Sequence, residues 1–327
     1  MVKLAILGAG RIARAMADTL RQMEQAGDRR VELYAVAARD GARAEAFARE
    51  YGIAKAYGSY EEMLSDPEVQ LVYIATPHSH HYAHGMLCVE HGKHVLCEKA
   101  FTVNARQAER LLQAGRERGL LVTEAIWNRY QPMSRMIREA VASGIIGEPR
   151  MIVANLCCPT TQKARILDPA LAGGALLDVG VYALNFAEMV FGWADGVQAS
   201  CVWSDTGVDL ADSITLTWKD GRVAMLQASA EVVSDRSGSV CGTHGYLVVE
   251  NLNNPQVLRI YNEEHQLVEE RHCPPQFTGY EYEVLEAASC IEQGLTQCPS
   301  MPHRETVHIM ELMDHIRAQW GLHYPGE

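Results

Sequence analysis

The sequence lacks several features that would assign a protein to a class at once. It has no basic stretch, and 29 Lys and Arg against 41 Asp and Glu leave a net charge of −12. This balance argues against nucleic-acid binding. We find no secretory leader and no apolar run long enough to span a bilayer, so we expect a cytoplasmic protein that is not bound to membranes. Hydrophobic residues still make up 48% of the chain, which indicates a globular protein.

Cysteine is present but not in a pattern that implies crosslinks or metal. The 9 cysteines are odd in number and form no C-x-x-C pair. Reduced thiols in a cytosolic protein are the simplest interpretation. No zinc-ligand spacing occurs either, and we predict no metal site. A length of 327 residues favours about two domains, and the chain has no internal repeats.

The first residues carry the clearest signal. Residues 4–7 form a short apolar run, as in a strand buried on both faces. Gly8, Gly10 and Ala13 follow at the spacing G-x-G-x-x-A, and a helical pattern begins at once. The glycines allow a tight turn and a close approach of backbone to a pyrophosphate, and the small third residue lets helix and strand pack. We favour a dinucleotide site over an ordinary turn.

The end of the second strand bears on the choice of cofactor. Residues 31–38 again form an apolar run, which ends in Arg39 and Asp40, with Arg43 one helical turn later. Guanidinium groups suit a 2′-phosphate, so we favour NADP(H) over NAD(H). Two alternatives remain open: Asp40 could hold the ribose hydroxyls of NAD, and both arginines could simply be solvated at a helix start.

Two further strand ends bring polar residues to the same edge of the expected sheet. Residues 71–76 end in Thr76 and are followed by Pro77, His78 and a run of histidines that includes His81. No carboxylate or cysteine motif accompanies the histidines, so we expect this loop to line a cofactor crevice rather than to bind metal. The alternative is that most of these side chains, His80 and His84 among them, are simply exposed. Residues 94–97 lead into Glu98, Lys99 and Ala100. A lysine there can stabilise a developing alkoxide, although a surface lysine is the alternative.

The alternation of strands and helices predicts a doubly wound parallel sheet of the Rossmann type, an α/β domain over residues 1–125. Residues 126–327 are richer in strands joined by short turns, which predicts an α+β domain with an open, mostly antiparallel sheet. A helix over residues 177–191 interrupts these strands and places Asp178 and Tyr182 on one face.

Four blocks of sequence together resemble a known family. They are LGAGRIA at residues 7–13, ATPHSHH at 75–81, GKHVLCEKA at 92–100 and GGALLDVGVY at 173–182. In this order they resemble the Gfo/Idh/MocA oxidoreductases. The segments VAARD, KAYGSYEE and EAIWNRYQP are most similar to the branch of dimeric dihydrodiol dehydrogenases. The chain departs from the family where Ala100 replaces the usual proline and Tyr182 a common histidine.

The resemblance implies an NADP(H)-dependent enzyme with an acid–base pair. Lys99 would be the catalytic lysine, Tyr182 the proton donor and acceptor, and Asp178 would position the substrate or tune the pair. A nearby ammonium would favour the phenolate of a tyrosine, whose usual pKa is about 10. Trp127 and Arg165 would line the substrate cleft. The cofactor would contact Gly8, Gly10, Arg11, Ile12, Ala13, Arg39, Arg43, Thr76, Pro77, His78, His81, Glu98 and Lys99.

We therefore expect an oxidoreductase that interconverts a secondary alcohol and a carbonyl on a small diol, sugar or dicarbonyl compound. A non-catalytic NADP(H)-binding sensor on the same fold is the alternative. We also expect a homodimer formed through the free face of the second-domain sheet. Alternating apolar residues over 214–218 and 224–230 motivate this expectation.

Overall fold

The structure, a computed structural model, describes all residues from Met1 to Glu327. It forms two compact units, Met1–Tyr130 with Gln276–Val307 and Gln131–Pro275 with His308–Glu327. The sequence predicted a single boundary after residue 125, with all later residues in the second domain. Gln276–Val307 instead joins the first unit, because helix α8 (Glu281–Glu292) packs there against α1 (Arg11–Gln25).

The first unit is built on a six-stranded sheet, and the prediction of a doubly wound parallel sheet is confirmed. The strands lie in the order β3-β2-β1-β4-β5-β6 and every neighbouring pair is parallel. They are β1 (Val2–Leu7), β2 (Val31–Ala37), β3 (Lys55–Tyr57), β4 (Leu71–Ile74), β5 (His94–Glu98) and β6 (Val122–Ala125). The order reverses between β1 and β4, where ligands of such sheets bind beyond the carboxyl ends of the strands.

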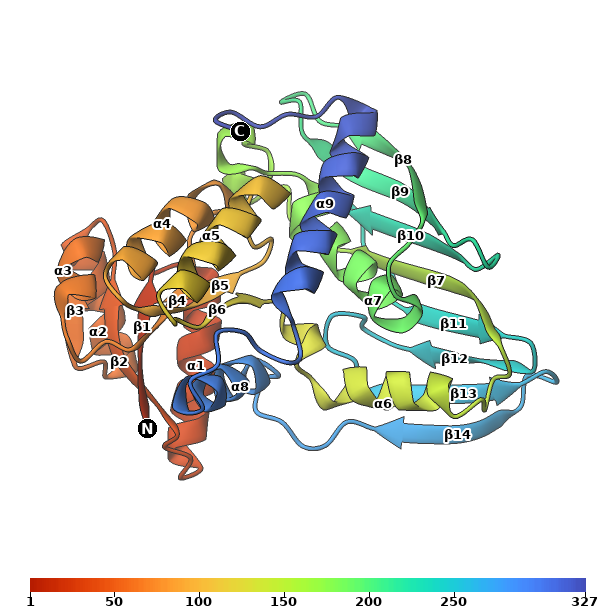
Figure 1. Cartoon of the computed structure of the whole chain (residues 1–327), viewed down its shortest axis with the longest axis horizontal. Helices are drawn as coiled ribbons and strands as arrows, with labels where there is room; N and C mark the ends of the chain where they lie inside the picture. Colours follow the sequence, from red (N-terminus) through yellow and green to blue (C-terminus); the bar gives the residue numbers. More distant parts are fainter. The chain divides into compact units, whose positions relative to one another are not determined.

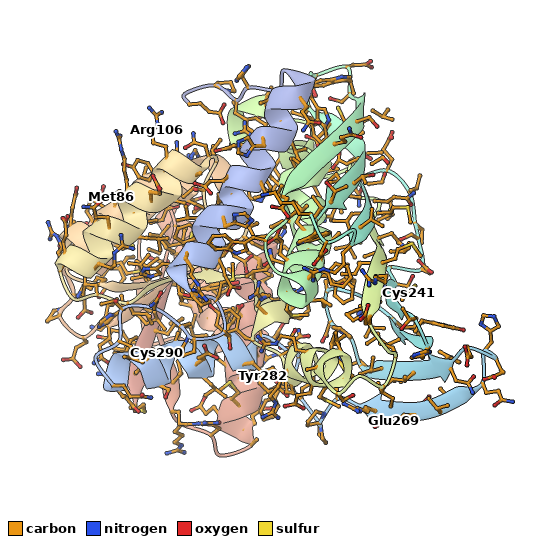
Figure 2. All side chains as sticks on the ribbon, turned by 45° about the vertical axis from the view of Figure 1, so that its right-hand side comes forward. Met86, Arg106, Cys241, Glu269, Tyr282 and Cys290 are labelled. Atoms are coloured by element: carbon orange, nitrogen blue, oxygen red, sulfur yellow. The ribbon has the colours of Figure 1, made fainter.

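Helices cover both faces of this sheet. Besides α1 and α8 they are α2 (Gly41–Tyr51), α3 (Tyr60–Ser65), α4 (His78–Glu90) and α5 (Ala105–Glu117). Figure 1 shows α4 and α5 side by side, and Gly85 makes their close approach possible, since a Cβ there would lie 2.5 Å from Leu111. Arg106 on α5 is exposed and points away from the fold (Figure 2).

The second unit contains an eight-stranded sheet in the order β14-β13-β12-β11-β7-β10-β9-β8, which confirms the predicted mostly antiparallel sheet. Only the β7–β10 pair is parallel. The strands are β7 (Pro149–Cys157), β8 (Gly196–Trp203), β9 (Asp209–Thr217), β10 (Val223–Ser229), β11 (Gly238–Gly242), β12 (Gly245–Val249), β13 (Val257–Asn262) and β14 (Leu267–His272). The strands β11, β13 and β14 contain glycine or charged residues that weaken the alternation of apolar and polar side chains, so they are hard to recognise in the sequence.

One face of this sheet is covered by helices of its own unit, chiefly α7 (Val181–Phe191), which packs on β7 and β10 (Figure 1). The other helices are α6 (Pro132–Ala142) and the greater part of α9 (His303–Trp320). Ile214 and Leu226 are buried on the covered face. The alternating apolar residues on which the expected dimer was based therefore pack inside the unit. This corrects the expectation that they form a free face of the sheet. The opposite face of the sheet carries both polar and apolar side chains.

The helical stretch Pro169–Phe191 also corrects the expectation that no apolar run could span a bilayer. It is long and apolar enough by length and composition, but 89% of its apolar window is buried inside the fold. Burial on this scale is that of a core helix in a globular domain.

Candidate active site

The glycine-rich turn joins β1 to α1 as the sequence predicted. Gly8 has a φ of +105°, and a Cβ there would lie 3.0 Å from the carbonyl oxygen of Ala75. Gly10 precedes α1 and provides no side-chain cap. Arg11 and Ile12 open the helix and Ala13 is buried against the sheet. The first N–H groups of α1 thus remain available for the phosphates of a dinucleotide.

Three charged residues after β2, Arg39, Asp40 and Arg43, differ in their contacts with the rest of the protein. The Asp40 carboxylate caps α2 by accepting the N–H of Ala42 at 3.0 Å. The Arg43 guanidinium donates two hydrogen bonds, at 2.8 and 3.1 Å, to the carbonyl oxygen of Ala9 in the glycine turn. Arg39 is exposed and makes no hydrogen bond within the protein. Of the three side chains, only Arg39 is thus uncommitted to the fold.

An aromatic pair accompanies Arg39. The rings of Tyr60 and His84 meet edge to face with their centroids 4.9 Å apart. Burial raises the pKa of Tyr60, and the positive charges of Arg39 and Arg43 oppose that rise. The sequence analysis did not assign Tyr60 to the site, because its position reads simply as the start of α3.

The histidine-rich loop after β4 is held in place by His81. This side chain is fully buried, and its two ring nitrogens lie 2.8 Å from the carbonyl oxygens of Thr76 and Ala100. Burial lowers the pKa of His81 to about 4, so the ring is neutral at neutral pH and donates to one of the two carbonyls. His81 therefore braces the loops that follow β4 and β5. Pro77 precedes α4, and His78, its first residue, is buried as well.

Glu98 is the last residue of β5, and Lys99 follows it directly. Glu98 is buried, and its carboxylate accepts a hydrogen bond from the hydroxyl of Tyr73 on β4. Its second oxygen lies 3.3 Å from the backbone N–H of Lys99. Lys99 itself is partly exposed. From the sequence, Tyr73 was predicted only to lie in a buried strand. Its contact with Glu98 depends on the pairing of β4 with β5, which the sequence alone does not specify.

Further buried carboxyl groups lie in the same unit. Burial raises the pKa of Glu124 to about 7 and that of Glu283 well above its usual range. Negative charge on Glu98 adds to the rise at both. Glu283 comes from α8, far along the chain from β5. No group of three or more His, Cys, Asp or Glu side chains is arranged to hold a metal ion.

Trp127 lies in the first unit, in a short 3₁₀ turn after β6. Its ring stacks on that of Tyr280, with centroids 4.1 Å apart and an interplanar angle of 10°. Burial and the charge of Glu98 raise the pKa of Tyr280, and Arg11 opposes the rise. Tyr280 escaped the sequence analysis because it directly precedes α8, which the sequence placed in the other domain.

The second unit supplies Asp178, Tyr182 and Arg165. Asp178 lies in one π-helical turn, Leu176–Gly180, which runs directly into α7, and Tyr182 is in the first turn of α7. Both side chains are at most 7% exposed. The Arg165 guanidinium donates to the Asp178 carboxylate at 2.8 Å. Asp178 and Tyr182 are four positions apart, so this helix start carries an anchored carboxylate and a phenol together.

The chain combines a Rossmann unit that has a lysine at a strand end with a second unit that has a buried carboxylate and a buried phenol, and these are the parts of a nicotinamide-dependent oxidoreductase. Comparison with known proteins agrees with this class. Residues 2–126 match the oxidoreductase family with an NAD-binding Rossmann fold, and residues 134–248 match the GFO/IDH/MocA C-terminal domain. The chain belongs to the GFO/IDH/MocA family of oxidoreductases.

Relatives are similar over nearly the whole chain. A trans-1,2-dihydrobenzene-1,2-diol dehydrogenase of Danio rerio is 33% identical and covers 99% of this chain and 98% of its own length. The Bos taurus enzyme of that name is 34% identical and covers 100% and 99%. Among solved structures, the 3-ketoreductase KijD10 of Actinomadura kijaniata, with NADP and TDP-benzene, superimposes with a TM-score of 0.87 at 25% identity, covering 97% of both chains.

Proposed function

We propose that this protein is an NADP(H)-dependent dehydrogenase or reductase that interconverts a secondary alcohol and a carbonyl. Its substrate would be a small diol, sugar or dicarbonyl compound, and it would act in the cytoplasm. The observation that carries the proposal is that the chain keeps both halves of an acid–base system: Lys99 at the end of β5, and Asp178 with Tyr182 at one helix start. Relatives named dihydrodiol dehydrogenases support this substrate class.

The nicotinamide cofactor supplies hydride transfer, and the residues of this chain bind it and move the proton. The N-terminus of α1 and the Gly8 turn hold the pyrophosphate, and Arg39 binds the 2′-phosphate. Tyr182 takes the hydroxyl proton during oxidation and returns it during reduction. Lys99 stabilises the phenolate and the developing alkoxide. Arg165 orients Asp178, which positions the substrate hydroxyl. Solved structures of the KijD10 ketoreductase include lysine-to-alanine and tyrosine-to-phenylalanine variants.

A substrate panel tests this function. Purified protein is assayed for NADPH oxidation with dicarbonyls and osones, and for NADP⁺ reduction with dihydrodiols and sugars. Saturable turnover of at least one compound is expected. A protein that binds NADPH but turns over nothing on the panel would instead be the non-catalytic sensor.

Arg39→Ala should weaken NADP⁺ binding and leave NAD⁺ binding nearly unchanged. A charge-assisted hydrogen bond to phosphate contributes about 1.5–3 kcal/mol, so the NADP⁺ dissociation constant should rise about tenfold or more. Asp40 caps α2 and position 38 is alanine, so no uncommitted acid stands at this strand end for NAD⁺. Fluorescence titration with both cofactors measures the effect.

Arg43→Ala is the matched control. Because Arg43 holds the carbonyl of Ala9 in the glycine turn, its loss should weaken the binding of both cofactors by similar factors. An equal loss for both cofactors in Arg39→Ala would show that Arg39 does not recognise the 2′-phosphate.

We also propose a homodimer through the free face of the second-unit sheet. Val153 and Met225, paired across β7 and β10, are 41% and 42% exposed there. On β12 and β13 of the same sheet, the rings of Tyr246 and Tyr261 stack on each other with centroids 5.0 Å apart. Light scattering should give about twice the chain mass of 36.2 kDa.

Met225→Glu should shift the protein towards the monomer, because it places a charge within the proposed interface. Val233→Glu is the control, since Val233 is 78% exposed outside the sheet. A wild-type mass of one chain at micromolar concentration would contradict the dimer.

A further inference from the structure

Two buried carboxyl groups on β9 have no part in the mechanism above. Asp209 and Asp212 are 0% and 4% exposed. Residues three apart on a regular strand point to opposite faces. Here a register shift opposite Val202 and Trp203 inserts Leu210 as an extra residue, which turns Asp209 to the same inner face as Asp212. The two carboxyl groups consequently interact directly.

Asp209 caps the helix start that carries the candidate catalytic residues. Its Oδ2 accepts the backbone N–H of Leu176, the first residue of the π-helical turn, at 2.6 Å. The residue before that turn, Ala175, offers no side-chain cap of its own. A carboxylate at this position satisfies an otherwise unpaired donor and interacts favourably with the positive end of the helix. The cap for Asp178 and Tyr182 thus comes from a strand far along the chain.

The turn before this helix is shaped around the Asp209 carboxylate. Gly174 has a φ of +111°, and a Cβ there would lie 2.1 Å from Asp209 Oδ1. Only glycine therefore allows both the turn and the close approach of the carboxylate. The carbonyl oxygen of Gly173 accepts the hydroxyl of Tyr324 at 2.6 Å. Asp209 and Tyr324 together fix the Gly173–Gly174 turn.

The second oxygen of Asp209 and both oxygens of Asp212 are buried and meet no N–H or O–H of the protein. Two ionised carboxylates in such a place would repel each other, and one proton between them supplies the missing donor. The other titratable groups facing the pair are the Cys201 thiol on β8 and the Tyr324 hydroxyl. Arg317, beside Tyr324, is paired with Asp314 and Glu327. No cation thus pairs with the two carboxyls, and burial raises the pKa of both.

We propose that Asp209 and Asp212 share one proton and act as positioning residues that fix the helix start bearing Asp178 and Tyr182. Neutral Asp212 donates to Asp209, and ionised Asp209 caps Leu176. The catalytic part of this inference rests on the proposed function, since it assumes that Tyr182 exchanges the substrate proton.

Asp209→Ala removes the cap. Turnover should fall by about 10–100-fold, because a displacement of roughly 1 Å can cost that much, while the Kd of NADP(H), which binds to the other unit, stays unchanged. Asp209→Asn keeps an oxygen for the Leu176 N–H and should restore turnover to within a few-fold of wild type. A fall in kcat without a change in cofactor affinity, rescued by the conservative variant, is not what a general loss of stability produces.

Asp212→Asn tests the shared proton, because its amide donates to Asp209 at any pH. In wild type the folded protein holds a proton that the unfolded chain releases above about pH 4. Stability should therefore fall as pH rises from there towards the raised pKa of the pair. In Asp212→Asn this fall in Tm should be smaller. Tm measured by calorimetry from about pH 5 to pH 9 compares the two proteins.

Hydrogen exchange of residues 173–182 decides the structural part without any substrate. Asp209→Ala should lose protection at the Leu176 amide, and Asp209→Asn should keep it. Unchanged protection and unchanged kcat in Asp209→Ala would overturn the proposal, as would identical pH profiles of Tm for wild type and Asp212→Asn. If no compound on the panel is turned over, the proposed function fails. Hydrogen exchange still tests whether Asp209 caps Leu176, and the pH profiles of Tm still test whether Asp209 and Asp212 share a proton.

Discussion

Tyr182→Phe should lower kcat by about 10²–10⁴-fold, the usual contribution of general acid–base catalysis. The substitution removes only the hydroxyl and keeps the ring, which is buried at the start of α7. Binding of NADP(H) should be unchanged, because the proposed cofactor contacts all lie in the other unit. The pH profile of the oxidation direction should also lose its main ionisation. Steady-state kinetics and a cofactor titration measure both effects.

Tyr51→Phe provides the matched control, since Tyr51 is the last residue of α2 and has no part in the proposed site or interface. It should leave kcat unchanged. Near-normal turnover and an unaltered pH profile in Tyr182→Phe would assign the proton to another residue. His78 and His81 would be the next candidates, although burial lowers the pKa of His81 to about 4 and weakens it as a base near neutral pH.

Lys99→Met should lower kcat over the same range of about 10²–10⁴-fold. It removes the ammonium that favours the phenolate and stabilises the alkoxide, while a methylene chain of similar length remains. If Lys99 acts through Tyr182, the losses will not add, and the double variant should be little worse than the worse single variant. Kinetics of wild type, both single variants and the double variant form the required cycle.

Lys219→Met is a suitable control because its side chain is 88% exposed. Fully multiplicative losses in the cycle would mean that Lys99 and Tyr182 have independent functions. Lys99 would then be a charge that positions the substrate rather than a partner of the tyrosine.

The Rossmann unit could be predicted because its signals are local. The apolar run of β1, the spacing of Gly8 and Gly10 and the helix after them occupy one short segment, and each residue acts on its chain neighbours. The same holds for the helix start with Asp178 and Tyr182. The candidate positions of the Rossmann unit could be predicted for the same reason, since the functional residues of a parallel sheet lie directly after its strand ends.

Roles that depend on distant contacts could not be predicted. Arg43 was expected to bind a phosphate, and its additional contact with the Ala9 carbonyl could not be foreseen, because that carbonyl approaches only when β1 and β2 pair. The stacking of Tyr280 on Trp127 requires α8 to return to the first unit. Asp209 lies 33 positions after Leu176 in the sequence, and an irregular strand register brings its carboxylate to the Leu176 N–H. Composition and periodicity contain no information on such pairings.

The most direct test of the central claim is NADP(H) turnover by wild type and Tyr182→Phe on the same substrate panel, with cofactor affinity measured in parallel. We expect wild type to turn over at least one diol, sugar or dicarbonyl compound with NADP(H). Tyr182→Phe should turn over that compound about 10²–10⁴-fold more slowly while binding NADPH as tightly as wild type. Tight NADPH binding without turnover by wild type, or full turnover by Tyr182→Phe, would contradict it.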